Sequence, residues 1–136
     1  MKKLVLITLF VCLGCVSHAF AQQTETHNYV VITRNIQQLH PILLAAQQLA
    51  TKHGSSMGNY EVIVCGKAVQ ELTDANKMAP LLEMAEQQQV TLLACGLSLH
   101  KFKIDTSAVV KGITVIENGL LYTFTKQEEG YKSITL

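Results

Sequence analysis

Short apolar runs alternate with stretches of helical periodicity along most of the chain. Residues 29–33 form a run of β-branched and aromatic residues, which predicts a strand. The apolar side chains that follow recur three and four residues apart, which predicts a helix over residues 38–53. Pro41 fits this helix only within its first turn, where no intrahelical N–H bond is lost. A strand followed by a helix is the repeating unit of a parallel α/β sheet.

A second unit follows with the same order. Residues 61–65 predict a strand, and a short helix carrying Val69 and Leu72 comes after it. Asp74 and Asn76 are candidate caps for a longer helix. The apolar face of that helix has the spacing i, i+3, i+4, i+7 and consists of Met78, Leu81, Leu82 and Ala85.

The last part of the chain repeats the alternation of strands and helices. It predicts strands over residues 90–94 and 113–116, a turn at Asn118-Gly119, a helix over 120–129 and a last strand within 131–136. These strands are apolar on both sides, as expected when helices cover both faces of a sheet. We therefore predict a three-layer α/β/α sandwich with a mainly parallel sheet of about five strands.

The first residues have the pattern of an export signal. Lys2 and Lys3 precede an apolar run over residues 4–16, and Ala19-Phe20-Ala21 provides small residues for signal peptidase. A membrane-spanning helix needs about 20 apolar residues, so this run is too short to be a permanent anchor. We predict a signal peptide over residues 1–21 and a single domain over 22–136. The mature chain would be periplasmic or secreted, with no integral membrane segment.

An alternative for the same segment is a lipoprotein. Leu13-Gly14-Cys15 loosely resembles the end of a lipoprotein box, in which Cys15 would carry the lipid. Cys12 stands where that box usually has leucine.

Composition narrows the class of protein. Of the 136 residues, 49% are apolar and 15% are charged, which excludes a disordered chain. The chain has 11 basic and 10 acidic residues and no basic run, so a nucleic-acid partner is not expected.

Two cysteines, Cys65 and Cys95, remain after the predicted signal, and both follow predicted strands. Neither has a second Cys or His at the spacing of a zinc half-site, so we expect neither a metal site nor a cofactor. In an exported protein a Cys65–Cys95 disulfide is an alternative, provided that their Cα atoms lie within about 7 Å.

Cys95 has the more suggestive surroundings. Gly96 follows it, and residues 97–102 predict a short helix that begins directly after the thiol. A thiol at a helix N-terminus has a lowered pKa and is a better nucleophile near neutral pH. His100 and Lys101 would add positive charge. The alternative is a structural Cys95, because free cysteines are often buried as small apolar residues.

The segment Val90-Thr-Leu-Leu-Ala-Cys95-Gly-Leu-Ser-Leu-His-Lys-Phe102 resembles the DsrE/DsrF-like family of small sulfur-handling proteins. Gly112-Ile-Thr-Val-Ile-Glu-Asn-Gly-Leu120 and Glu129-Gly-Tyr131 extend the resemblance. It implies a parallel α/β sheet, trimers or hexamers, and a cysteine, here Cys95, that holds sulfur as a persulfide. Cys65 has no counterpart in that pattern. The export signal departs from the family's cytoplasmic members, which changes the expected partner and pathway.

The leading hypothesis is therefore a sulfur carrier or sulfurtransferase-type protein that relays sulfane sulfur on Cys95. The alternative is a non-enzymatic exported binding or assembly module with a structural Cys95. Leu120, Leu121 and Phe124 are interpreted as core by default, with subunit contact as the other interpretation.

Overall fold

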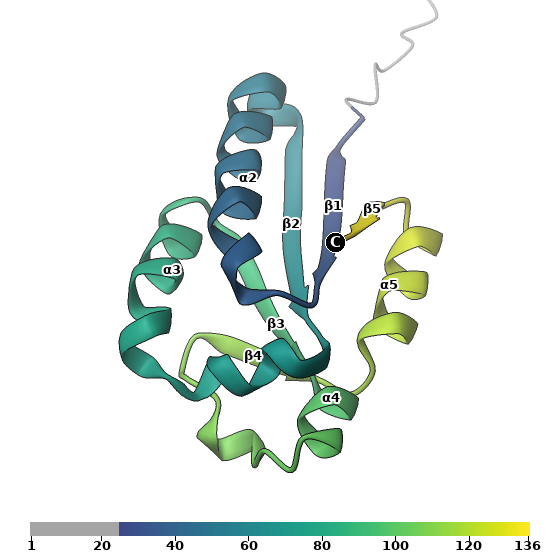
Figure 1. The fold of residues 1–136 in the computed structure, drawn as a ribbon. Coiled ribbons are helices and arrows are strands. Elements are labelled where there is room, and N and C mark those ends of the chain that lie inside the picture. Colours follow the sequence, from purple (N-terminus) through teal and green to yellow (C-terminus); the bar gives the residue numbers. More distant parts are fainter. Residues whose placement is uncertain (1–24) are drawn as a thin grey trace, which may run out of the picture.

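Five strands form one sheet in the order β4-β3-β2-β1-β5 (Figure 1). The computed structural model describes residues 25–136. All four strand pairings are parallel, which confirms the predicted sheet. The strands are β1 (His27–Thr33), β2 (Met57–Val64), β3 (Val90–Cys95), β4 (Ile113–Ile116) and β5 (Lys132–Thr135).

The predicted signal peptide, residues 1–21, lies outside the described residues. So does Cys15 of the lipoprotein alternative. Within residues 25–136, no helix has the length and apolar character needed to cross a membrane.

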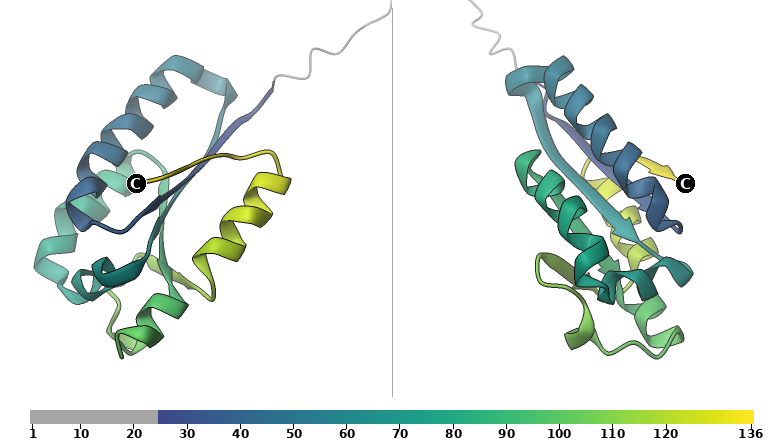
Figure 2. Two further views of the ribbon diagram at one scale, coloured as in Figure 1. Left: turned by 45° about the vertical axis from the view of Figure 1, so that its right-hand side comes forward. Right: turned by 60° about the vertical axis from the view of Figure 1, so that its left-hand side comes forward.

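Helices lie on both faces of the sheet, so the molecule has three layers (Figure 2). One face packs against α2, α3 and the 3-10 helix η3, and the other packs against α5. The helices are α2 (Leu39–His53), α3 (Ala75–Gln87), α4 (Gly96–Lys101) and α5 (Gly119–Glu128). The 3-10 helices are η1 (Ile36–Gln38), η2 (Gly54–Ser56), η3 (Gly66–Thr73) and η4 (Thr106–Ala108). The predicted α/β/α sandwich is confirmed.

Alternation along the strands divides the core between the two faces. Val62 and Val64 of β2 point into the larger core under α2, α3 and η3. Ile63, between them, points to the α5 face, because successive strand side chains point to opposite faces. Cys95 belongs to that second core, and Cys65 packs against it. Both thiols therefore share the α5 side of the sheet.

Aromatic and charged residues attach α5 to the sheet. Tyr122 and Tyr131 pack against the second core, and the Lys126 ammonium lies 5.3 and 4.9 Å from their ring centroids. Glu61 of β2 is 8% exposed, and its Oε2 has no hydrogen-bond partner among the described residues. Burial and the neighbouring Glu61 carboxylate raise the pKa of Tyr122 to about 12.

The outer face of α5 corrects one expectation. Leu120 and Leu121 are each 63% exposed and Phe124 is 58% exposed, so their interpretation as core is wrong. The buried positions of α5 are instead Gly119 and Thr123, and the Thr123 hydroxyl donates to the Gly119 carbonyl at 2.8 Å. Gly119 and Thr123 face the sheet together with Tyr122, because the helix begins close against it, whereas Leu120, Leu121 and Phe124 point outward.

Several element boundaries differ from the sequence prediction, for example at β2 and α5. Strand β2 begins at Met57 rather than at residue 61, because its first residues pair with β1. Asn118 is the N-cap of α5 rather than part of an isolated turn. Its side chain accepts hydrogen bonds from the N–H groups of Leu120 and Leu121 at 3.0 and 3.3 Å.

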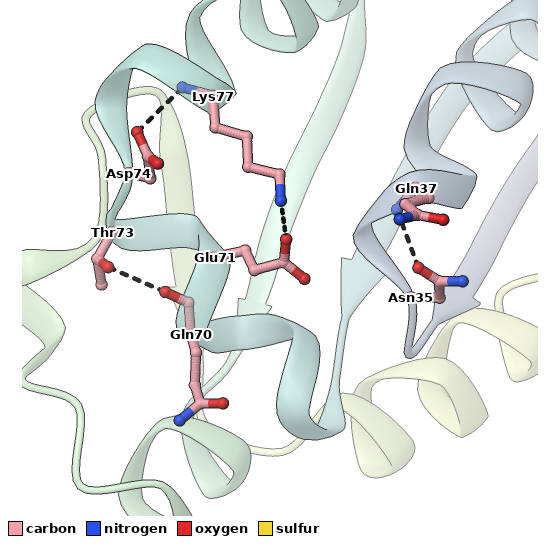
Figure 3. Close-up of polar contacts among 7 residues, drawn as sticks. All are labelled: Asn35, Gln37, Gln70, Glu71, Thr73, Asp74 and Lys77. Carbon is pink, nitrogen blue, oxygen red and sulfur yellow. Dashed lines mark hydrogen bonds and ion pairs between the residues drawn. The ribbon is translucent and has the colours of Figure 1, made fainter.

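Asp74 caps α3, as predicted, by accepting the Lys77 N–H at 3.1 Å (Figure 3). Asn76, the other candidate, is the second residue of the helix rather than its cap. The Lys77 ammonium also pairs with the Glu71 carboxylate of η3. The start of α3 is thus tied to the preceding 3-10 helix.

We predict that Asp74→Ala lowers the free energy of unfolding by about 1 kcal/mol, because the first turn of α3 loses its acceptor. Urea unfolding followed by circular dichroism measures the change. Asp74→Asn is the matched control, since asparagine caps about as well as aspartate. An equal loss in both variants would show that the charge, rather than the cap, stabilises this helix.

Candidate functional site

The two thiols lie side by side at the carboxyl edge of the sheet. Cys95 is the last residue of β3, and Cys65 follows directly after β2. Val64 and Ala94 are partners in the β2–β3 ladder, so the next residue on each strand is a cysteine. Neighbouring strands are about 4.8 Å apart, which puts the two Cα atoms within disulfide range. Both residues are free thiols in this structure.

A pocket of about 460 Å³ opens at this edge, where ligands of parallel α/β sheets usually bind. Its walls bring together both sulfur-bearing residues, three cationic side chains and an apolar rim. The lining residues are Ile32, Arg34, Cys65, Gly66, Lys67, Cys95, Leu97, Ser98, Lys101, Phe102, Asn118, Leu120 and Thr135. The cationic side chains can therefore attract a small anionic ligand into a pocket whose walls are largely apolar.

Hydrogen bonds converge on the Cys95 sulfur. The residue is only 5% exposed, and the Gly119 N–H, the first of α5, donates to its Sγ at 3.4 Å. Burial would raise the pKa of Cys95, but hydrogen bonds from the Ser98 hydroxyl, the Gly119 and Ser98 N–H groups and Cys65 outweigh burial and lower it. Of the two thiols, Cys95 is therefore the one that ionises more readily.

Cys65 has the opposite character. Burial is the largest cause that raises its pKa to about 12, and the charge of Cys95 and the hydrogen bond to it raise the pKa further. Arg34 acts in the other direction, but more weakly. Cys65 is consequently a protonated thiol beside Cys95. Two residues of the same type thus differ in protonation because their hydrogen-bond partners differ.

Ser98 links the two strand ends. Its hydroxyl oxygen accepts the N–H of Gly66, the residue after Cys65, at 2.9 Å. The same hydroxyl helps lower the pKa of Cys95. This side chain holds the segment after β2 against the first turn of α4.

Gly119 allows α5 to begin directly over the thiols. A Cβ atom at this position would lie 2.8 Å from the Cys65 Sγ, 3.0 Å from Ile63 Cγ2 and 3.4 Å from the Cys95 Cβ. Any side chain here would displace the helix or the sulfurs. The N–H group that reaches Cys95 therefore depends on glycine.

The structure separates the predicted supporting residues. Lys101 lines the pocket, whereas His100 is exposed and is not part of its wall. A Cβ on Gly96 would lie 2.9 Å from the Ile116 carbonyl oxygen, so glycine lets β3 and β4 end close together. The Leu97 N–H then donates to the Glu117 carbonyl at 3.0 Å.

Four contributors were not expected from the sequence: Arg34, Lys67, Ser98 and Gly119. Arg34 and Lys67 follow the first and second strands by one and three residues, so the end-of-strand rule could have found them. Nothing local indicated that the Gly119 N–H meets a sulfur 24 residues away. In residues 25–136, no three His, Cys, Asp or Glu side chains cluster as a metal site would require.

No model of a known protein family matches the chain, and no curated protein matches it. The chain is similar to MTH1491, a protein of unknown function from Methanobacterium thermoautotrophicum. That match has a TM-score of 0.66 and 18% identity, and it covers 82% of this chain and 99% of the other. It is also similar to BT1422, a conserved protein of unknown function from Bacteroides thetaiotaomicron, with a TM-score of 0.59 and 18% identity over 80% and 95% of the two chains. At this identity the similarity extends to the fold alone.

We predict that alkylation distinguishes the two thiols. Trypsin would release Cys95 in peptide 78–101 and Cys65 in peptide 53–67. In the native protein, labelling of peptide 78–101 should rise with pH at a midpoint below the ordinary thiol value of about 8.5, because only the thiolate reacts. Peptide 53–67 should stay unlabelled until the pH approaches the Cys65 pKa of about 12. Mass spectrometry after pulses of iodoacetamide measures both.

Ser98→Ala should move the Cys95 midpoint upward, because a donor to the thiolate is lost. Ser107→Ala, on the exposed 3-10 helix η4, is the control and should leave the midpoint unchanged. Coincident midpoints for the two native peptides would contradict the proposed difference. In urea both peptides should label alike.

Proposed function

We propose that this protein is a sulfur carrier or sulfurtransferase-type protein of the DsrE kind, in which Cys95 holds sulfane sulfur as a persulfide. The observation that carries the proposal is the Cys95 sulfur at a strand end, on the wall of a pocket, with hydrogen bonds from Gly119 and Ser98 that favour the thiolate. A stabilised thiolate is the form that attacks sulfur. The resemblance around Cys95 agrees with this chemistry.

Transfer needs two displacements at sulfur and no cofactor. The Cys95 thiolate attacks the outer sulfur of a donor persulfide, a Cys95 S–S bond forms, and the donor leaves as its thiolate. An acceptor thiolate then attacks the outer sulfur of the Cys95 persulfide, takes that sulfur, and regenerates the Cys95 thiolate. Each step exchanges one S–S bond for another, so no external oxidant or reductant is consumed.

The pocket suits an anionic sulfur compound. Arg34, Lys67 and Lys101 line it together with the thiols, and positive charge raises the local concentration of anions. Leu97, Phe102 and Leu120 supply apolar wall, which limits water around the persulfide. Export through residues 1–21, or lipid anchoring through Cys15, would place donor and acceptor outside the cytoplasm.

We predict that Cys65→Ser treated with a sulfane donor gains one sulfur atom on peptide 78–101, and that Cys95→Ser gains none there. Intact mass and peptide mapping after desalting provide the measurement. Cys65→Ser is used because it keeps Cys95 and removes the neighbouring thiol, and Cys95→Ser is its matched control. Equal uptake by Cys65→Ser and Cys95→Ser would assign the sulfur to another residue and refute the carrier role.

A homo-oligomer, a trimer or hexamer, belongs to the same proposal, and exposed apolar residues favour it. Leu120, Leu121 and Phe124 on α5 and Ile134 on the edge strand β5 are each more than half exposed. Exposed apolar residues gathered on neighbouring elements mark interaction surfaces. The same surface is the basis of the second candidate, a binding or assembly module in which Cys95 is only structural.

We predict that Leu121→Glu reduces the sedimentation coefficient of the wild-type assembly to that of a monomer, because a carboxylate would be buried without a partner in the interface. Leu44→Glu is the matched control. Leu44 is also exposed, at 39%, but lies on α2, across the sheet from α5. A wild-type monomer in analytical ultracentrifugation would refute the oligomer.

A further inference from the structure

The relay described above gives no role to Cys65, although this thiol lies against the reacting sulfur. Cys65 and Cys95 follow the paired residues Val64 and Ala94 at the ends of neighbouring parallel strands. A Cβ atom on Gly119 would lie 2.8 Å from the Cys65 Sγ and 3.4 Å from the Cys95 Cβ, so both cysteines border the same small space. A thiol held beside a persulfide-forming cysteine has the position of a resolving cysteine.

We propose that Cys65 resolves the Cys95 persulfide, so that the protein releases sulfane sulfur as hydrosulfide and is left with a Cys65–Cys95 disulfide. This inference rests on the proposed persulfide function and adds a second outcome for the same sulfur. The ligand class is therefore a sulfane compound, and the product is sulfide.

The reaction balances within the protein. The Cys65 sulfur attacks the inner sulfur of the persulfide, which is the Cys95 Sγ, and the bond between the inner and outer sulfurs breaks. The outer sulfur leaves with the bonding electron pair and takes the proton of Cys65, so hydrosulfide is released. The sulfane sulfur is reduced, and the two cysteine sulfurs are oxidised to the disulfide.

Position decides which sulfur of the persulfide is attacked. Cys65 lies beside Cys95 at the next strand end, and the Cys95 Sγ becomes the inner sulfur. An external acceptor must come through the pocket, where the outer sulfur lies first in its path. Attack at the inner sulfur releases sulfide, and attack at the outer sulfur transfers it. The same persulfide can thus have two products, depending on whether an acceptor arrives before Cys65 reacts.

The protonation states put the steps in order. The thiolate of Cys95 reacts first with the donor, while Cys65 stays protonated because burial and the Cys95 charge raise its pKa. When Cys95 becomes a persulfide, its Sγ no longer carries the thiolate charge, so one cause of the raised pKa is weakened. Arg34, which favours the Cys65 thiolate, lines the same pocket.

The disulfide product requires a reductant before another cycle. The reaction that consumes it must be thiol–disulfide exchange with an external dithiol, which would attack from the pocket side. Without such a partner each chain releases a single sulfide. The proposal therefore predicts a stoichiometry of one sulfide per chain, which can be measured.

The test compares the full chain with Cys65→Ser, Cys65→Ala and Cys95→Ser. Cys12 and Cys15 are replaced by serine in every sample, so that sulfur counts refer to this site. Each fully reduced protein is treated with inorganic polysulfide without air and desalted. Sulfide is trapped with a bimane reagent through both steps, and peptides 53–67 and 78–101 are mapped. A donor-free sample measures background oxidation, and circular dichroism verifies the fold of each variant.

We expect wild type to release one more sulfide per chain than the Cys65 variants, in which uptake frees only the leaving group of the polysulfide, and to yield peptides 53–67 and 78–101 linked by a disulfide. Both Cys65 variants should lack this additional release and retain the added sulfur on peptide 78–101. Cys95→Ser should neither retain nor release sulfur. Agreement between Cys65→Ser and Cys65→Ala guards against an effect of one replacement on folding.

Two results would overturn the inference in distinguishable ways. If wild type holds its added sulfur as long as the Cys65 variants do, or forms the linked peptide without matching sulfide, the resolving role is wrong and the carrier function stands. If neither wild type nor the Cys65 variants gain sulfur on peptide 78–101 or release sulfide, the carrier function fails, and the resolving role fails with it.

Discussion

The parallel pairing of β2 with β3 is the constraint on which the site depends. Its register places Val64 opposite Ala94, and the chain then supplies a cysteine at the next position of each strand. A shift of one residue would turn one thiol to the other face of the sheet, because strand side chains alternate. The apolar side chains that alternate along β2 and β3 hold this register through burial on both faces. Packing of the core thus sets the distance between the two sulfurs.

The pKa values of the two thiols differ because different groups surround each strand end. Cys95 ends its strand beneath the first N–H of α5 and beside the Ser98 hydroxyl of α4. Within the described residues Cys65 has no equivalent set of donors, and burial and the neighbouring Cys95 raise its pKa. One thiol therefore ionises more readily, and the other remains protonated beside it. Gly119 lets α5 begin directly over both cysteines, because any larger residue would collide with the thiols.

The α5 layer has a second consequence for the surface. The helix begins close to the sheet and turns Gly119, Thr123 and Tyr122 inward, so Leu120, Leu121 and Phe124 are exposed. Leu120 also lines the pocket. The exposed apolar surface of α5 therefore adjoins the pocket that holds the thiols.

The sequence by itself determined the order of strands and helices, the parallel α/β class and the strand-end position of both cysteines, because hydrophobic period and cap residues are local signals. The Asp74 cap and the end of β3 at Cys95 followed from such signals. The outward face of α5 did not, since its apolar residues have the spacing of a core helix. Only the tertiary structure decided that Gly119 meets Cys95, that Arg34 and Lys67 share the pocket, and that His100 stays outside it. These contacts join residues far apart in the chain, and their geometry depends on how the layers pack.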